Sequence, residues 1–226
     1  MARYLNIYDV LKGKLWRARL DEINKQWLKL IAEIQALAQC GLTFTENKFD
    51  KDRYTRLMEI SAELAALSSS KSKEVIRDIF SLEKGYATPK VDVRSFVLKD
   101  NKVLLVKERS DGLWTLPGGF ADVSETPSEA VIRETKEESG FDVSVIKLLA
   151  LWDKLKHDHP LHWPHIYKCF FHCRYISGEA KENIEISEVD FFSLDKIPPL
   201  STPRVTETQL KKLFQLATSQ GPTVFD

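Results

Sequence analysis

Three glutamates recur at a spacing that suits metal-dependent chemistry: Glu134, Glu137 and Glu138. The surrounding sequence predicts a helix over about 127–138, because Thr126 and Glu129 form a capping box and Gly140 suits a left-handed stop. At about 100° per residue, the three carboxylates fall on one side of that helix, where like charges repel. A bound Mg²⁺ or Mn²⁺ ion removes this repulsion, since hard cations take carboxylate and phosphate oxygens as ligands. The spacing therefore predicts a divalent-metal site; the alternative is a solvated acidic helix without chemistry.

The pattern around these glutamates extends over 23 positions. It resembles the Nudix hydrolase box at every charged and glycine position: Gly119, Glu125, Arg133, Glu134, Glu137, Glu138 and Gly140. The departures are Thr135 and Phe141, which stand where the family usually has aliphatic residues. A threonine hydroxyl can donate to a carbonyl in the preceding turn, so we expect a small loss of packing and no loss of chemistry.

The resemblance implies a metal-binding and catalytic set. The Gly119 carbonyl and the carboxylates of Glu134, Glu137 and Glu138 would hold Mg²⁺ or Mn²⁺, and Glu134 or Glu138 would assist the attacking water. Water attack on a pyrophosphate places more charge on its oxygens, and divalent ions would neutralise that charge. The expected reaction is hydrolysis of a pyrophosphate bond.

The same resemblance makes Glu125 and Arg133 a mainly structural ion pair. Another acid late in the fold often completes such a site. Three acids compete for this role, namely Glu185, Glu188 and Asp190, and we favour Glu188 as a further metal ligand.

A second resemblance covers the chain from about Trp27 to the end. It rests on the segments IQALAQCGLTFTENKFDKDRY, GYATPKVDVRSFVL, DGLWTLPGG, DKLKH and VFD. These are similar to the bacterial Nudix subgroup with an N-terminal helical domain that includes CDP-choline pyrophosphatases. The resemblance implies hydrolysis of CDP-choline or CDP-ethanolamine to CMP and a phospho-alcohol, and a homodimer formed through the helices. Relatives with this domain are also labelled ADP-ribose pyrophosphatases, which would give AMP and ribose 5-phosphate.

The segment 153–167, DKLKHDHPLHWPHIY, is the best place to look for substrate contacts. Its lysines suit phosphates, its aromatic rings and histidines suit stacking on a base, and Trp152 or Trp163 could contribute to a cage for choline. An ordinary loop with a packed tryptophan is the alternative. The candidate substrate-binding residues are Lys154, Lys156, His157, Trp163 and Tyr167, together with Arg94 on an early strand.

Two competing interpretations concern the same residues. Arg94 could form an Arg-carboxylate surface pair instead of binding phosphate. The histidines of the segment could bind zinc, although no cysteine pair supports this: His157, His159, His162 and His165. Trp114, beside the glycine turn, is expected in the core.

Composition favours a cytoplasmic protein without affinity for polyanions. The 226 residues carry 33 basic and 33 acidic side chains, so neither nucleic acid nor an anionic membrane is an expected partner. The three cysteines form no CxxC pair, which indicates reduced thiols. No apolar run is long enough to span a membrane. Residues 1–20 form a basic extension, for which a transit peptide, a surface-binding arm and an amphipathic docking helix are the alternatives.

Residues 21–85 have apolar side chains at helical spacing and predict three helices, the first ending at Gly41. Ten basic and eleven acidic residues in this region argue against a DNA-binding module. Such a short helical unit cannot bury its apolar faces alone, so we expect it to pack on the other domain or on a second subunit, and we favour dimerisation.

Residues 86–226 predict a Nudix hydrolase domain. A hairpin turning at Asp100 and Asn101 precedes the box helix, and strands over 143–152, 166–175 and 189–194 and a helix within 203–216 follow it. The predicted class is α+β, with a Nudix-type α/β/α sandwich and mixed sheet after a small all-α domain. Besides a pyrophosphohydrolase, we consider a nucleotide-sensing regulator that binds without turnover and a structural dimerisation scaffold.

Overall fold

The computed structural model describes residues 7–160, 163–219 and 221–226. The chain forms two compact units, Met1–Thr88 and Pro89–Asp226. The predicted division between residues 85 and 86 falls close to the junction of these units. No helix among the described residues is long and apolar enough to cross a membrane.

The first unit consists of helices: α1 (Ile7–Phe44), α2 (Lys48–Leu67) and α3 (Lys73–Ser81). The prediction of a helical N-terminal region is confirmed, but α1 also includes residues 7–20 of the predicted extension. Gly41 was predicted to stop the first helix, and this is wrong because α1 continues to Phe44. A Cβ atom at Gly41 would overlap the ring of Tyr54, so the glycine serves the close approach of α1 and α2.

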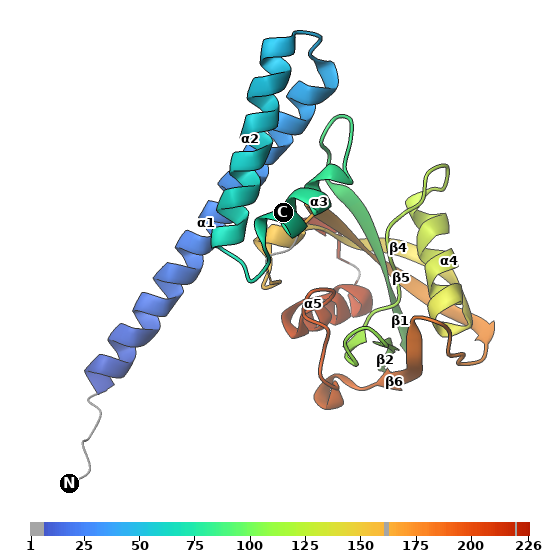
Figure 1. Ribbon diagram of the computed structural model, residues 1–226. Coiled ribbons are helices and arrows are strands. Elements are labelled where there is room, and N and C mark those ends of the chain that lie inside the picture. The colour runs from blue at the N-terminus through green and yellow to red at the C-terminus, as the bar shows by residue number, and fades with distance from the viewer. Residues whose placement is uncertain (1–6, 161–162, 220) are drawn as a thin grey trace. The chain divides into compact units, whose positions relative to one another are not determined.

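The second unit is built on a mixed sheet (Figure 1). The strands are β1 (Lys90–Lys99), β2 (Lys102–Glu108), β3 (Trp114–Thr115), β4 (Phe141–Asp153), β5 (Ile166–Gly178), β6 (Ile186–Phe192) and β7 (Val224–Phe225). Their order in the sheet is β3-β2-β1-β5-β4-β7, with β6 also paired to β2, and the parallel pairs are β1 with β5 and β4 with β7. Two short 3₁₀ turns complete it: η1 (Lys154–Lys156) and η2 (Leu194–Lys196).

Two helices cover opposite faces of the sheet, α4 (Pro127–Ser139) and α5 (Glu207–Thr218) (Figure 1). Ala130 and Val131 of α4 pack with Val93 and Val97, whereas Leu210 of α5 lies in a separate core with Phe96 and Trp114. Adjacent residues of β1 therefore face different helices, as the period-2 geometry of a strand requires. The predicted α/β/α sandwich is confirmed, and Trp114 is in the core as expected.

The start of β1 pairs with the loop before α4 instead of with β2. The hairpin turns as predicted at Asp100 and Asn101, which both have positive φ. Pairing of β1 with β2 is confined to the residues next to that turn. Farther along, the N–H of Val93 donates to the Gly119 carbonyl at 2.8 Å, and the N–H of Ser95 donates to the Pro117 carbonyl at 2.9 Å. This pairing fixes the glycine loop beside β1.

The bounds predicted for the strand that precedes the C-terminal helix were wrong. It was predicted over 189–194, but β6 is Ile186–Phe192. Ile186 is fully buried and pairs with Glu108, whereas Leu194 begins η2. The apolar residues near the end of the predicted strand obscured this shift.

Candidate active site

Gly118 and Gly119 bring the loop backbone against β1 and α4. Gly118 has a φ of 142°, and a Cβ atom there would overlap the Val93 carbonyl. A Cβ atom at Gly119 would lie 2.9 Å from the carboxylate of Glu134. Side chains at these positions would therefore displace the loop from the box carboxylates.

Glu138 is the most buried of the three box glutamates. Its residue is 7% exposed, and its Oε2 accepts a hydrogen bond of 2.8 Å from the backbone N–H of Gly118. Burial raises the pKa of Glu138 to about 8, a shift that the charge of Arg94 opposes. A nearby cation would offset this burial and return the carboxyl to its ionised form.

Glu134 and Glu137 share a guanidinium. The Arg133 Nη1 lies 2.9 Å from Glu134 Oε1 and 3.1 Å from Glu137 Oε2. The side chain of Glu134 is 15% exposed and that of Glu137 is 60% exposed. Burial raises the pKa of Glu134, against the opposing effect of Arg133. The solvent exposure of the three predicted ligands therefore increases from Glu138 through Glu134 to Glu137.

The pair predicted from the box is present in the structure. Arg133 donates to both carboxylate oxygens of Glu125, at 3.0 Å from Nε and 2.7 Å from Nη2, and Glu125 also accepts from the N–H of Asp122. The hydrogen bonds from Arg133, followed by the one from Asp122, lower the pKa of Glu125 to about 2. The Thr135 hydroxyl donates to the Val131 carbonyl at 2.6 Å, so the predicted back-bond is confirmed.

The donor set fits Mg²⁺ or Mn²⁺ by its chemistry. No group of three acidic, histidine or cysteine side chains already arranged to hold a metal occurs in the part of the chain that the structure describes. Glu134 and Glu138 nonetheless lie within range of each other's charge, and both have a raised pKa that a cation would reverse. Mg²⁺ commonly takes one or two carboxylates and fills its other positions with water and phosphate oxygens. The Gly119 carbonyl already accepts from Val93 and has one lone pair left.

Sequence reasoning missed a buried cluster of charges next to this site. Arg94 donates from Nε and Nη2 to the two oxygens of Asp92, both at 2.9 Å, and from Nη1 to the Leu116 carbonyl at 3.1 Å. Lys168 Nζ lies 2.8 Å from the same Asp92. Burial alone would raise the Asp92 pKa, but Arg94 and Lys168 hold it well below its usual range. The Arg94 pair is thus buried, and the surface pair considered for it is wrong.

Glu108 is a second residue that was missed. It is 8% exposed, ends β2 and accepts from Arg204 Nε at 2.8 Å. Burial raises its pKa, and its charge reaches both Arg94 and Glu138. A lone acid at the end of the apolar run VLLVKE was a usable signal.

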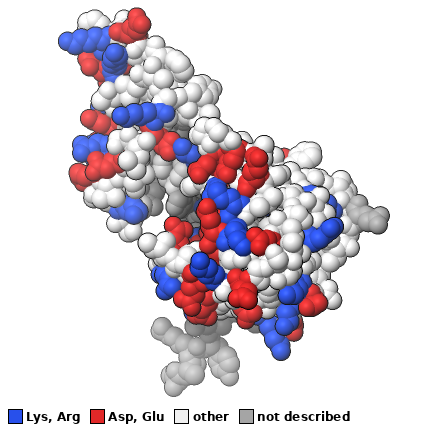
Figure 2. Space-filling view, turned by 90° about the vertical axis from the view of Figure 1, so that its right-hand side faces the viewer, with Lys and Arg blue, Asp and Glu red and all other residues white. Residues whose placement is uncertain are grey.

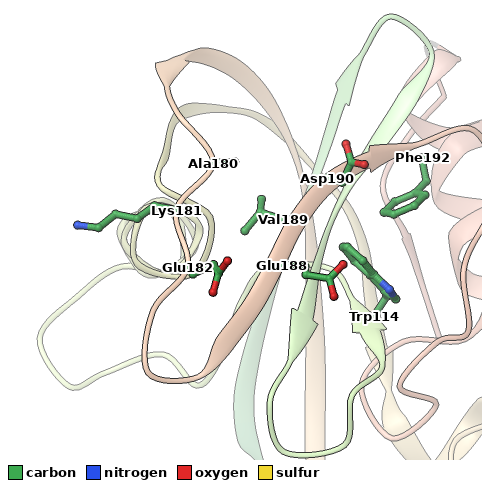
Figure 3. Close-up of a pocket in the computed structure, with 8 residues that line it drawn as sticks. All are labelled: Trp114, Ala180, Lys181, Glu182, Glu188, Val189, Asp190 and Phe192. Atoms are coloured by element: carbon green, nitrogen blue, oxygen red, sulfur yellow. The ribbon is translucent and has the colours of Figure 1, made fainter.

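Glu188 lies in a different setting from the box carboxylates. Its Oε1 is 2.6 Å from Lys107 Nζ, and it lines a cleft of about 490 Å³ with Asp190, Trp114 and Phe192 (Figure 3). None of the box glutamates lines this cleft. The proposed completion of the metal site by Glu188 stays a prediction, for which Glu108 is now the competitor.

The segment 153–167 contributes one buried cation. Lys154 is 5% exposed, and burial lowers its pKa while Asp92 opposes the shift. Lys156 and Tyr167 are exposed, and Trp163 is half-buried. No hydrogen bond or ion pair of the Lys154 side chain is found within the described residues.

The histidines of this segment have separate partners. His157 lies 3.1 Å from Asp226, His159 contacts the Thr202 carbonyl, and His165 lies 2.9 Å from Asp153. These contacts do not bring the three rings around a common ion. The fourth histidine of the zinc alternative, His162, lies outside the described residues.

Comparison with known proteins defines the class. The NUDIX domain model matches residues 88–213, and a model described as "UDP-X-like, N-terminal oligomerisation domain" matches residues 25–80. The chain belongs to the Nudix hydrolase family. It is a pyrophosphate hydrolase by that membership, and the family generally uses divalent metals such as Mg²⁺ or Mn²⁺.

Three relatives are similar over long stretches. The putative ADP-ribose pyrophosphatase YjhB of Bacillus subtilis is 44% identical over 206 residues, which cover 91% of this chain and 99% of that protein. The crystal structure of a UDP-X diphosphatase matches 90% of this chain and 99% of its own, with 32% identity and a TM-score of 0.59. The crystal structure of an ADP-ribose pyrophosphatase from Streptococcus suis matches 62% of this chain and 100% of its own, with 40% identity and a TM-score of 0.57.

Proposed function

We propose that this protein hydrolyses ADP-ribose to AMP and ribose 5-phosphate. The observation that carries the substrate is the 44% identity, over almost the whole of both chains, to a protein named "Putative ADP-ribose pyrophosphatase YjhB". The relatives described above give no support to CDP-choline, which the short segments of the sequence had favoured. A UDP-linked substrate is the second candidate, because the UDP-X diphosphatase structure matches both units of the chain.

The proposed chemistry centres on Glu134 and Glu138. With the Gly119 carbonyl, and with Glu137 at the wet edge, they would hold Mg²⁺ or Mn²⁺, which supplies charge neutralisation at the pyrophosphate. A carboxylate that the bound cation keeps in its ionised form can accept a proton from the attacking water. Glu138 has the higher burial and the direct contact with Gly118, so we assign it the proton-accepting role.

A homodimer through the first unit is part of the proposal. Large apolar side chains are exposed along one stripe of α1, at spacings of four, three and seven residues: Ile23, Trp27, Leu30 and Leu37. Such an exposed apolar stripe suits burial against a second copy. Light scattering should give twice the chain mass, and Trp27→Glu together with Leu30→Glu should reduce it to the mass of one chain.

Small-molecule substrates suit the surface better than nucleic acid does. On the face shown in Figure 2, acidic and basic side chains are interspersed instead of forming a broad basic patch. The overall charge balance agrees with this arrangement. A nucleotide-sensing regulator would need to bind without turnover, and the box carboxylates are those of a hydrolase. A cytoplasmic location stays a prediction.

A substrate panel tests the proposal directly. ADP-ribose, a UDP-sugar, CDP-choline, CDP-ethanolamine and a dinucleoside polyphosphate would each be incubated with Mg²⁺, with Mn²⁺ and with chelator, and the products identified. The expected outcome is AMP and ribose 5-phosphate from ADP-ribose, lost on chelation. A higher kcat/KM for CDP-choline than for ADP-ribose would restore the alternative substrate. Nucleotide binding without any turnover would favour the regulator.

A further inference from the structure

His159 has a buried ring nitrogen that lacks a partner among the described residues. The residue is 6% exposed, and its Nδ1 lies 2.7 Å from the Thr202 carbonyl. A carbonyl only accepts, so Nδ1 carries the proton and Nε2 of the neutral ring is an acceptor. No hydrogen-bond partner of Nε2 exists among the residues that the structure describes. Burial lowers the pKa of His159 to about 4, which keeps the ring neutral near pH 7. Its environment therefore calls for a hydrogen-bond donor.

Lys154 lies within range of this ring and carries a charge that its surroundings do not balance. The charges that reach it are those of Asp92, Arg94 and Arg204. Asp92 is already bound by both Arg94 and Lys168. Arg204 is in turn occupied by Glu108 and by Asp111. A buried ammonium without a counter-ion is unfavourable, so an anion is the complementary ligand.

These two groups differ in what they recognise. The Lys154 ammonium attracts a negative group, whereas His159 Nε2 accepts from a hydroxyl or an N–H. The charges of Lys154 and Lys168 both reach His159 and would repel a cationic ligand from it. A trimethylammonium group offers no donor and carries a positive charge. A phosphorylated sugar offers both an anion and hydroxyl donors.

We propose that Lys154 and His159 form a subsite for the half of the substrate beyond the cleaved bond, and that this half is a phosphorylated sugar such as ribose 5-phosphate. The inference rests on the proposed function and makes it more specific. It gives a physical reason for discrimination against CDP-choline. The subsite is assembled from Lys154 of η1 and from His159, within range of the charges of Asp92, Arg94 and Lys168 on β1 and β5.

Calorimetric titration of the full chain in chelator tests the subsite without turnover. The probes are ribose 5-phosphate, phosphocholine and inorganic phosphate. Wild type should bind ribose 5-phosphate at least about tenfold more tightly than phosphocholine. Lys154→Met should weaken ribose 5-phosphate and phosphate alike. Lys211→Met, which changes an exposed lysine of α5, is the matched control and should weaken neither.

The His159 variants separate recognition from folding. His159→Asn keeps a donor near the Nδ1 position and loses the acceptor, so it should weaken ribose 5-phosphate at least about fivefold and leave phosphate unchanged. His159→Gln places an oxygen near the Nε2 position and should recover part of the loss. The comparison between ligands on wild type stays decisive if a variant fails to fold.

Two results would overturn the subsite: phosphocholine binding as tightly as ribose 5-phosphate, or unchanged ribose 5-phosphate affinity in a folded His159→Asn protein. Failure of the proposed function looks different. In that case the substrate panel shows no hydrolysis of ADP-ribose, although ribose 5-phosphate still binds in the Lys154-dependent manner.

Discussion

The box carboxylates and the buried cluster of Asp92, Arg94 and Lys168 are neighbours, but they depend on the sequence in different ways. Glu134, Glu137 and Glu138 come from one helix and need only its period to meet on one side. The cluster around Asp92 needs β1, β5 and η1 to be in place before its charges meet. In the proposed mechanism the first region neutralises negative charge through a recruited cation, whereas the second contains positive side chains of its own. Spacing within one helix therefore predicts the first region, whereas the second depends on the tertiary structure.

The sharpest test of the carboxylate region is Glu138→Gln. It removes the ionisable group of the most buried box residue, so kcat should fall by roughly 10³-fold or more. Glu137→Gln, at the exposed end of the set, should lose less. Steady-state kinetics with ADP-ribose and Mg²⁺ would measure both, and circular dichroism would verify folding. Equal kcat for Glu138→Gln and wild type would contradict the assignment.

Disrupting the cluster around Asp92 should lower the stability of the fold. Asp92→Asn leaves Arg94 and Lys168 buried without their shared anion, which should lower the free energy of unfolding by about 3–5 kcal/mol. Urea denaturation followed by tryptophan fluorescence would measure the loss. Glu182→Gln, which breaks an exposed pair with Arg109, is the control and should cost at most about 1 kcal/mol. Comparable losses in the two variants would mean that the cluster does not depend on Asp92.

The acid that assists the box can be identified by a paired comparison. Glu108→Gln should lower kcat/KM by about tenfold, because the charge of this buried acid reaches both Arg94 and Glu138. Glu188→Gln should change kcat/KM by less than about threefold if its main partner is Lys107. The reverse order would return Glu188 to the metal site and place the substrate nearer the cleft of Figure 3.

The smallest expected effect is a pH dependence of metal-free stability. Burial raises the folded-state pKa of Glu138 to about 8 from an ordinary 4.5. The contribution of Glu138 to the free energy of unfolding is therefore fully present below pH 4.5. It is lost as the pH rises toward 8, because this carboxyl ionises more readily in the unfolded chain than in the folded one. In chelator, wild type should lose a few degrees more in Tm than Glu138→Gln between about pH 6 and about pH 8.5. Added Mn²⁺ should remove this difference, whereas parallel pH profiles without metal would contradict the raised pKa.

The same contrast explains how far the sequence could be interpreted. The box, its capped helix, the hairpin and the sandwich could be predicted, because each depends on the spacing of residues within short stretches of the chain. The partner of Glu108 and the cluster around Asp92 could not, because residues far apart in the sequence meet there: Arg204 with Glu108, and Lys168 with Asp92, 76 positions away. Gly41 was mistaken for a helix stop because its Tyr54 neighbour belongs to another helix. The substrate could not be chosen from short shared segments, because these do not distinguish relatives that act on different nucleotides.

Arg133 has a consequence for how the site would load. Its guanidinium donates to both oxygens of Glu125 and also to Glu134 and Glu137. It therefore competes with an incoming metal ion for the carboxylates of Glu134 and Glu137. An ion that coordinates Glu134 Oε1 has to share or displace that contact, and its apparent affinity includes the cost of doing so. The free Mg²⁺ or Mn²⁺ concentration needed to fill the metal site would thus depend on Arg133 as well as on the number of ligands.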